Sequence, residues 1–369
     1  MQKTVIITGV GGQLGQFLVK KFLSEGVQVI GTIRHKSYDN QPWLFNKKDI
    51  TIDLMDLNDA HSIENIIIKY KPTYFVNSAA NAFVGESWSV PEQHIQQNTI
   101  GVLHQLEAIR KHSPHTRYLN LGTSEEFACS EISGPQNEET KIAPKSPYGC
   151  SKAASRYLID VYKVSYNLYA LQPWCFNFES ELRGEKYLTG KVAKGVARIY
   201  HAIKQNKPFE PIELGNLYSS RSWQYAEDVA DGIYRMLNQE EYRHDLKEIA
   251  DNLDETFNSW AEDIVPNLKN YCFSEADTHT IKEFVQLAFS EVGITGHWEG
   301  EKENEKYIGQ IGEWVNLVTI NPKFYRPIDV TYLYGDASLA RKELDWKSTV
   351  KFPELVKRMV KWHVDNYKE

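Results

Sequence analysis

The stretch Thr8-Gly-Val-Gly-Gly-Gln-Leu-Gly15 is the part of the sequence that indicates the fold most clearly. The β-branched run Thr4–Thr8 leads into it and predicts a short buried strand. Residues 13–25 follow with apolar side chains on one helical face, and Gly26 closes this predicted helix. The glycine-rich turn therefore joins a strand to a helix, which predicts the first βα unit of a parallel sheet.

The same alternation of strands and helices continues through the first half of the chain. Strands are predicted at residues 27–33, 74–77, 118–121 and 168–171, with helical stretches between them. This pattern predicts an α/β protein with a Rossmann-type, doubly wound parallel sheet.

The second half is less regular and richer in aromatic and charged residues. We predict a dinucleotide-binding domain at 1–176 and a smaller substrate-binding lobe at 177–369, with some segments returning to the first domain. Apolar residues at helical spacing over 242–268 predict an amphipathic helical insertion. Packing onto the body of the protein is the favoured interpretation of this helix, and a lid or a subunit contact is the alternative.

Composition excludes several classes of function. The 369 residues are 25% charged and 41% hydrophobic, with a net charge of -7, which is typical of globular proteins and unfavourable for nucleic acid or anionic membranes. No apolar run reaches transmembrane length, and Met1-Gln-Lys3 leads straight into a strand, so neither a membrane span nor a signal peptide is expected. Four widely spaced cysteines (Cys129, Cys150, Cys175 and Cys272) fit neither a metal site nor a disulfide framework, which favours a reducing cytoplasm.

The glycine-rich turn has the spacing of a dinucleotide-binding loop. Gly9 permits a tight turn, Gly12 lets the backbone approach a pyrophosphate, and Gly15 lets the helix pack close to the strand. Gln13 and Leu14 begin the helix, whose N-terminus favours a bound anion. A purely structural turn is the alternative, but the strand–turn–helix context favours a bound dinucleotide.

The end of the second strand indicates which dinucleotide binds. Arg34-His-Lys36 occupies the position where NAD-binding sites have a carboxylate for the ribose 2′-hydroxyl. Because Arg can pair with a 2′-phosphate, the sequence favours NADP, and a solvated basic turn is the alternative. Asp56 and Leu57 are candidates for contact with the adenine. We assign Ser78-Ala-Ala80, after the strand at 74–77, to the same cofactor site.

Tyr148 and Lys152 are the candidate redox residues. They are four positions apart and so share one face of a helix. The lysine ammonium favours the phenolate and lowers the pKa of the tyrosine, which can then act as general base for a hydroxyl group. A Tyr-x-x-x-Lys pattern is common, but its place after several βα units strengthens this interpretation.

Thr123-Ser-Glu125 follows the strand that ends at Leu121, at the carboxyl edge of the sheet where such folds bind ligands. Thr123 can hydrogen-bond an oxygen that becomes a ketone. Glu125 can remove the acidic proton beside a carbonyl and then, as an acid, help a β-hydroxyl leave. Alternatively, Glu125 complements a helix dipole, a role that Glu126 could equally fill.

Motifs along the chain resemble the extended short-chain dehydrogenase/reductases and, within them, the GDP-mannose 4,6-dehydratase family. The resemblance runs from residue 4 to about residue 364, apart from 242–268. The motifs that carry it, in chain order, are Gly9 to Gly15, Lys71-Pro-Thr73, Gly122-Thr-Ser-Glu-Glu-Phe127, Ser146-Pro-Tyr-Gly149, Phe176-Asn-Phe-Glu-Ser180, Leu214-Gly-Asn-Leu217, Arg221-Ser-Trp223, Trp298-Glu-Gly300, Glu303-Asn-Glu305, Phe324-Tyr-Arg-Pro327 and Gly335-Asp336.

The resemblance implies elimination of water from a GDP-sugar, with NADP reduced and reoxidised in each turnover. Tyr148 would deprotonate the C4 hydroxyl as hydride leaves C4, while Glu125 would take the C5 proton and assist loss of the C6 hydroxyl. Return of the hydride to C6 would give a 4-keto-6-deoxy sugar nucleotide. Thr123 and Lys152 would position and polarise the reacting groups.

The resemblance also implies binding residues and a homodimer or homotetramer. Arg183 would contact the cofactor. The residues implied in binding the GDP-sugar are Ser124, Asn177, Lys191, Arg221, Arg326 and Asp329.

Four positions depart from the family pattern, namely Phe83, Phe178, Gly190 and Ser222, where the family has His, His, Arg and Asp. They make a GDP-heptose or a GDP-N-acetylhexosamine a reasonable variant substrate. A sugar-nucleotide epimerase or ketoreductase on the same fold is one alternative function, and a non-catalytic NADP-binding scaffold is another.

Overall fold

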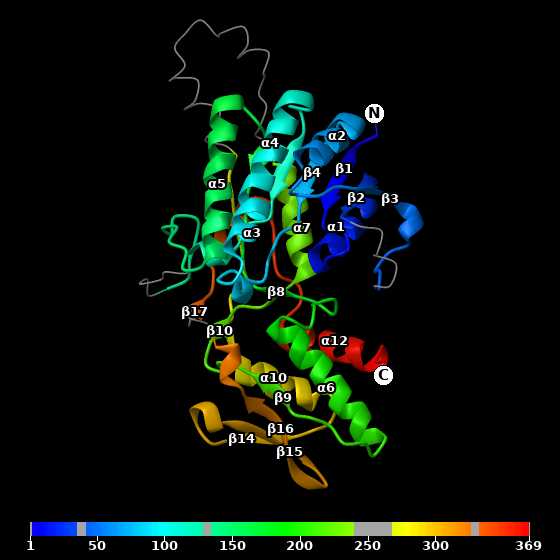
Figure 1. Cartoon of the computed structure of the whole chain (residues 1–369), viewed down its shortest axis with the longest axis vertical. Helices are drawn as coiled ribbons and strands as arrows, with labels where there is room; N and C mark the ends of the chain where they lie inside the picture. The colour runs from blue at the N-terminus through cyan, green and yellow to red at the C-terminus, as the bar shows by residue number, and fades with distance from the viewer. Residues whose placement is uncertain (1, 35–41, 128–133, 240–267, 326–331, 369) are drawn as a thin grey trace, which may run out of the picture. The chain divides into compact units, whose positions relative to one another are not determined.

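The computed structural model describes residues 2–34, 42–127, 134–239, 268–325 and 332–368 (Figure 1). The chain forms two compact units, and successive segments of the chain belong to one unit and then to the other. Unit 1 comprises 1–175, 229–273 and 336–347, and unit 2 comprises 176–228, 274–335 and 348–369. The first crossing follows Cys175, and the chain returns from unit 2 to unit 1 twice.

A six-stranded parallel sheet forms the centre of unit 1. Its strand order, β3-β2-β1-β4-β5-β6, confirms the predicted doubly wound Rossmann-type sheet. The strands are β1 (Thr4–Thr8), β2 (Gln28–Ile33), β3 (Thr51–Leu54), β4 (Tyr74–Asn77), β5 (Arg117–Asn120) and β6 (Ala170–Leu171). β5 begins and ends one residue earlier than predicted, and β6 is shorter than the predicted strand at 168–171.

Helices cover both faces of this sheet because side chains alternate along each strand. Phe75 belongs to a core cluster that includes Ile63, Val102 and Ile159. The adjacent Tyr74 packs instead on Phe22, with ring centroids 5.6 Å apart. The helices of unit 1 are α1 (Gln13–Ser24), α2 (Ala60–Tyr70), α3 (Pro91–Ile95), α4 (Gly101–His112), α5 (Pro147–Tyr166), most of α7 (Ala226–Leu237) and α11 (Ser338–Leu344).

A short strand pair brings a distant segment into unit 1. β7 (Trp174–Cys175) pairs in parallel with β12 (Cys272–Phe273). The main-chain N–H of Gln172 also donates to the side chain of Asn270 at 2.7 Å. On either side of residues 240–267, Gln239 and Lys269 exchange two hydrogen bonds of 3.1 and 3.3 Å, so the described residues that flank this segment lie side by side. The predicted helix at 242–268 lies almost entirely outside the described residues.

Unit 2 combines small sheets with α-helices. Its largest sheet has the order β14-β15-β16-β9, and another has the order β13-β10-β17. The strands are β8 (Phe178–Glu179), β9 (Ile212–Leu214), β10 (Ser220–Arg221), β11 (Gln224–Tyr225), β13 (His279–Thr280), β14 (Gly296–Glu299), β15 (Lys306–Ile311), β16 (Glu313–Ile320) and β17 (Tyr332–Leu333). The helices are α6 (Leu188–Lys204), α10 (Ile281–Ser290) and α12 (Phe352–Asp365).

Aromatic packing holds the helices of unit 2 together. The ring of Phe352, at the start of α12, stacks on Trp223 with centroids 5.6 Å apart. It also approaches Phe284 of α10 at 6.0 Å. A reciprocal capping box between Thr280 and Glu283 fixes the start of α10. In the described part of the chain, no helix is long and apolar enough to cross a membrane.

Candidate active site

The β1–α1 turn has the close contacts that only glycine permits. Gly9 has a φ of +64°, and its carbonyl accepts a hydrogen bond from the N–H of Gly12 at 2.8 Å. A Cβ at Gly15 would lie 2.3 Å from the carbonyl oxygen of Gly9, so the helix packs directly on the turn. α1 begins after Gly12, which has no side chain to cap the N–H groups of the first turn. The N-terminus of α1, with Gln13 and Leu14, is thus suited to binding an anion.

A row of buried polar groups fixes the segment beside this turn. The hydroxyl of Thr8 donates to Asn77 at 2.7 Å and accepts from the N–H of Ala79 at 2.9 Å. A Cβ at Gly9 would lie 3.0 Å from the Cα of Ala79. Ser78, Ala79 and Ala80 therefore run along the glycine turn, at the carboxyl end of β4.

The other predicted cofactor residues occupy different surroundings. Arg34 is exposed directly after β2, while His35 and Lys36 lie outside the described residues. Asp56 is half-buried, and its carboxylate accepts from the N–H of Asn58 at 2.9 Å. Leu57 has its side chain in the hydrophobic core, so only its main chain is available to a ligand.

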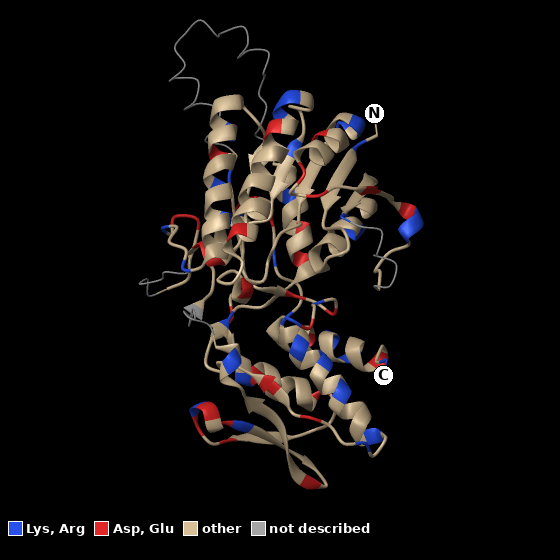
Figure 2. Cartoon of the chain, in the orientation of Figure 1, with Lys and Arg blue, Asp and Glu red and all other residues tan. Residues whose placement is uncertain are grey.

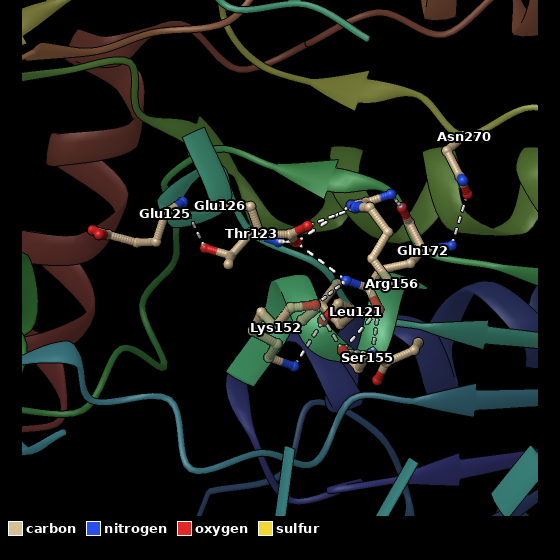
Figure 3. Close-up of polar contacts among 10 residues, drawn as sticks. Leu121, Thr123, Glu125, Glu126, Lys152, Ser155, Arg156, Gln172 and Asn270 are labelled. Atoms are coloured by element: carbon tan, nitrogen blue, oxygen red, sulfur yellow. Dashed lines mark hydrogen bonds and ion pairs between the residues drawn. The ribbon is translucent and has the colours of Figure 1, made fainter. Parts of the chain in front are cut away.

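A short 3-10 helix, Ser124–Phe127, follows β5 and carries Glu125, and Thr123 immediately precedes it. The hydroxyl of Thr123 accepts from the N–H of Glu125 at 3.3 Å. Thr123 and Ser124 are buried, whereas Glu125 is half-buried. Figure 3 shows the side chains of Glu125 and Glu126 leaving this turn in opposite directions.

Helix α5 carries Tyr148 in its first turn. Ser146 caps the helix by accepting from the N–H of Gly149 at 3.0 Å, and Pro147 begins it. The ring of Tyr148 lies edge-on to that of the buried His94, with centroids 6.0 Å apart. A Cβ at Gly149 would lie 2.7 Å from the carbonyl oxygen of Glu125, so the turn packs on α5 beside Tyr148.

Lys152 is buried one helical turn after Tyr148. Its ammonium donates to the carbonyl of Leu121 at 2.8 Å. Burial lowers the pKa of Lys152 to about 8, and the charge of Glu126 offsets part of this shift. The structure therefore brings Thr123, Glu125, Tyr148 and Lys152 to one edge of the unit 1 sheet.

A buried ion pair between Glu126 and Arg156, which was not predicted from the sequence, lies behind this turn. Glu126 and Arg156 are 0% and 2% exposed, and the guanidinium Nε lies 2.5 Å from the carboxylate Oε2. Glu126 also accepts from the N–H of Thr123 at 3.0 Å and from Gln172 Nε2 at 3.2 Å. The position of Arg156 could have indicated this pair, because Arg156 follows Lys152 by four residues and so lies on the same helical face.

Unit 2 contains Arg183, predicted to contact the cofactor, and most of the residues predicted to bind the substrate, whereas Ser124 is in unit 1. Arg183 forms an ion pair with the buried Glu179 at 3.1 Å, and its guanidinium lies 3.8 Å from the ring centroid of Tyr187. The carbonyl of Asn177 accepts from the N–H of Gln224 at 3.0 Å. Arg221 is on β10, and its Nη1 donates to the carbonyl of Ser220 at 2.8 Å.

Lys191 is in α6, along which Figure 2 shows further basic residues. Its ammonium lies 3.6 Å from the ring centroid of Phe324, and burial lowers its pKa. A cavity of about 930 Å³ is lined by basic and acidic side chains, among them Lys191, Lys194, Arg198, Glu185, Glu210 and Glu213. Arg326 and Asp329 lie outside the described residues, so the substrate-binding set is placed only in part.

Two of the departures from the family pattern have structural reasons. A Cβ at Gly190 would lie 2.5 Å from the carbonyl oxygen of Arg183, so α6 approaches the preceding loop too closely for a side chain. Ser222 is fully buried, and its hydroxyl lies 2.6 Å from that of Ser274. Phe83 precedes a 3-10 turn in unit 1, and Phe178 is half-buried on β8 in unit 2.

Comparisons with known proteins agree over the length of the chain. A sequence model of the family described as GDP-mannose 4,6 dehydratase matches residues 6–269 and 262–359. The chain belongs to the GDP-mannose 4,6-dehydratase family. The Drosophila melanogaster GDP-mannose 4,6 dehydratase is 32% identical, covering 98% of this chain and 86% of that protein. The human protein of the same name is 31% identical, covering 99% and 91%.

Solved structures share the fold of this family member at low identity. The Thermotoga maritima UDP-glucose 4-epimerase with UDP-glucose has a TM-score of 0.75 at 18% identity, covering 99% of this chain and 100% of that one. The Bacillus anthracis dTDP-glucose 4,6-dehydratase in complex with NAD has a TM-score of 0.71 at 18% identity, covering 99% and 97%. Family membership confirms the resemblance drawn from the sequence motifs, and these structures support the fold alone.

Proposed function

We propose that this protein is a GDP-sugar 4,6-dehydratase, which converts GDP-mannose or a close GDP-sugar to the 4-keto-6-deoxy sugar nucleotide. Family membership supports the class of reaction. The observation that carries the proposal is the packing of the Glu125 turn on α5 beside Tyr148, where a Cβ at Gly149 would lie 2.7 Å from the Glu125 carbonyl oxygen. An acid–base carboxylate and a Tyr/Lys pair at one sheet edge are the groups that oxidation followed by elimination requires.

The residues of the β1–α1 turn fit a dinucleotide. Close contacts at Gly9 and Gly15 leave the turn without side chains, and the N-terminus of α1 offers N–H groups to a pyrophosphate. The exposed Arg34 after β2 is suited to a 2′-phosphate, which supports NADP. When bound, the cofactor supplies a hydride acceptor for C4 of the sugar and a hydride donor for C6.

Tyr148 acts as the general base that takes the proton of the C4 hydroxyl. The Lys152 ammonium lies on the same helical face and favours the phenolate form of Tyr148. The hydrogen bond from Lys152 to the carbonyl of Leu121 holds the ammonium at the end of β5. Thr123, two residues further along the chain, hydrogen-bonds the oxygen that becomes the C4 ketone.

Glu125 is the acid–base group of the elimination step. It takes the C5 proton, made acidic by the C4 carbonyl, and then protonates the departing C6 hydroxyl. Its half-buried side chain remains accessible, whereas the carboxylate of Glu126 is fully buried and paired with Arg156. The helix-dipole alternative applies equally to both residues, whereas the difference in burial supports Glu125 as the acid–base group.

Unit 2 supplies the groups that bind the GDP portion. Arg221 and Lys191 are cations suited to a diphosphate. The same binding role is proposed for Asn177 and Arg326. Ser124 of unit 1 and Asp329 are proposed to bind the substrate, and Arg183 is proposed to contact the cofactor.

The test is incubation of the purified protein with GDP-mannose, a GDP-heptose and a GDP-N-acetylhexosamine, without added reductant. Product mass and stereochemistry are then followed. Loss of one water supports the dehydratase. Unchanged mass with altered stereochemistry would instead identify an epimerase, a requirement for added reductant would identify a ketoreductase, and no product from any sugar would favour a non-catalytic scaffold.

Assembly and location are further parts of the proposal. Tyr157 and Val161 of α5 are 58% and 54% exposed, which supports a homodimer or homotetramer that covers this helix. Light scattering after size exclusion would decide the assembly. The buried cysteines Cys175 and Cys272 are free thiols, which supports a reducing, cytoplasmic location.

A further inference from the structure

The buried ion pair between Glu126 and Arg156 is costly to place in a protein core. Both side chains are almost fully removed from water, at 0% and 2% exposure. Exchange of such a pair for apolar residues is often neutral or stabilising, because desolvation opposes the attraction between the charges. The stability of the fold therefore does not by itself account for this pair.

The pair connects the two segments that carry the candidate catalytic residues. Glu126 Oε1 accepts from the N–H of Thr123 at 3.0 Å, which fixes the start of the turn. Arg156 Nε donates to Glu126 Oε2 at 2.5 Å, which fixes the turn to α5 one helical turn beyond Lys152. Figure 3 shows these bonds converging on the carboxylate of Glu126, on the side of the turn away from Glu125.

Gln172 completes the connection. Its Nε2 donates to Glu126 Oε1 at 3.2 Å and to the carbonyl of Lys152 at 2.9 Å, so one amide spans the turn and the helix. Its carbonyl accepts from Arg156 Nη1 at 2.6 Å, and its Oε1 accepts from Asn120 at 2.7 Å. The carboxylate, the guanidinium and the amide therefore form one satisfied network that joins β5, α5 and the end of β6.

We propose that Glu126 and Arg156, with Gln172, are positioning residues that hold Thr123 and Glu125 in register with Lys152 and Tyr148. The inference rests on the proposed function and deepens it. Glu126 touches none of the reacting groups, and it acts through the main chain of Thr123 and through α5. Loss of the network lets the turn shift on the helix, and a shift of about 1 Å is enough to cost about a hundredfold in rate.

The main test is the double variant Glu126→Met/Arg156→Met, which removes both charges together. The expected result is a fall in kcat of about tenfold or more, with a smaller change in KM for the GDP-sugar, because the residues proposed to bind it, apart from Ser124, are in unit 2. Elimination should suffer more than oxidation, since Glu125 is displaced, and so reduced nicotinamide should accumulate during turnover. Main-chain amides of residues 121–126 should exchange hydrogen faster than in the wild type.

Two further variants keep the test decisive. Glu126→Gln retains the side-chain size but places an amide donor against the donors of Arg156. If the double variant does not fold, kcat, KM and amide exchange of Glu126→Gln test the proposal instead. Glu107→Gln is the matched control. This carboxylate accepts from Tyr162 of α5 at 2.7 Å and from Arg110 at 2.9 Å, remote from the turn, and its loss should leave kcat within about twofold of the wild type.

The inference is overturned if the folded variants keep wild-type kcat, or if kcat falls while the exchange of residues 121–126 stays unchanged. A wild-type protein that is inert toward every GDP-sugar would count against the proposed function instead. In that case the hydrogen exchange of the amides of residues 121–126 would still show whether the ion pair holds the turn in place.

Discussion

The ammonium of Lys152 donates a 2.8 Å hydrogen bond to the carbonyl oxygen of Leu121, which joins α5 to the end of β5. Leu121 is followed by Gly122, Thr123 and the turn that carries Glu125. This bond therefore fixes the position of α5 relative to that turn. The lysine is 2% exposed, and its surroundings favour the neutral amine relative to an exposed lysine. A buried cation is thereby kept beside Tyr148 at some cost to stability.

That cost gives a prediction on stability and its pH dependence. Folding lowers the pKa of Lys152 from 10.5 to about 8, so the unfolded chain binds more protons between these values and wild-type stability rises with pH through that window. Lys152→Met should therefore raise the free energy of unfolding at pH 7 by on the order of 2 kcal/mol, after loss of the hydrogen bond is subtracted.

The gain should shrink as the pH rises from 8 towards 10, because the lysine of the folded wild type is then neutral and its deprotonation in the unfolded chain costs progressively less free energy. Urea denaturation of both proteins at the two pH values measures this, together with a loss of dehydration activity in the variant. Equal or lower stability of Lys152→Met at pH 7 would contradict the prediction.

Glu125→Gln should block elimination while leaving oxidation partly intact. An amide cannot take the C5 proton, so dehydration should fall by about a hundredfold or more. Reduced nicotinamide should appear on mixing with the GDP-sugar and persist. Stopped-flow absorbance and product mass measure the two steps separately, and formation of the 4-keto-6-deoxy product at the wild-type rate would exclude the assigned role.

Gly15→Ala should disrupt the cofactor turn, whereas Gly12→Ala should be milder. The added Cβ would lie 2.3 Å from the Gly9 carbonyl oxygen at position 15 but 3.1 Å from it at position 12. Displacement of α1 at the first site would move the N–H groups that bind the pyrophosphate. Cofactor content after purification, measured by nicotinamide absorbance, should rank wild type, Gly12→Ala and Gly15→Ala in descending order. The reverse ranking of the two variants would count against the packing argument.

Arg34→Asp should shift cofactor preference from NADP toward NAD. The substitution removes a cation and adds a carboxylate that repels a 2′-phosphate, so the Kd for NADP should rise by about tenfold or more. Titration of both cofactors into apoprotein measures the change, and Arg358→Asp on α12 in unit 2 controls for the altered net charge. An unchanged ratio of the two Kd values would assign 2′-phosphate recognition to other residues.

Local pattern was sufficient for much of the fold and part of the site. The run Thr4–Thr8, the glycines at 9, 12 and 15 and the helix that follows were predictable, because strand pattern and turn geometry depend on near neighbours. The spacing of Tyr148 and Lys152 likewise placed both residues on one face of α5. The order of the family motifs then indicated the class of reaction.

Only the tertiary structure separated Glu125 from Glu126. The two carboxylates are adjacent and chemically alike, and the difference between them comes from Arg156, 30 residues further along the chain, which takes Glu126 into the core. Gly190 is a similar case, since its lack of a side chain is explained by the Arg183 carbonyl that α6 approaches. The sequence by itself determined which groups are present and on which elements they lie, whereas contacts between distant segments decided which carboxylate is left accessible for chemistry.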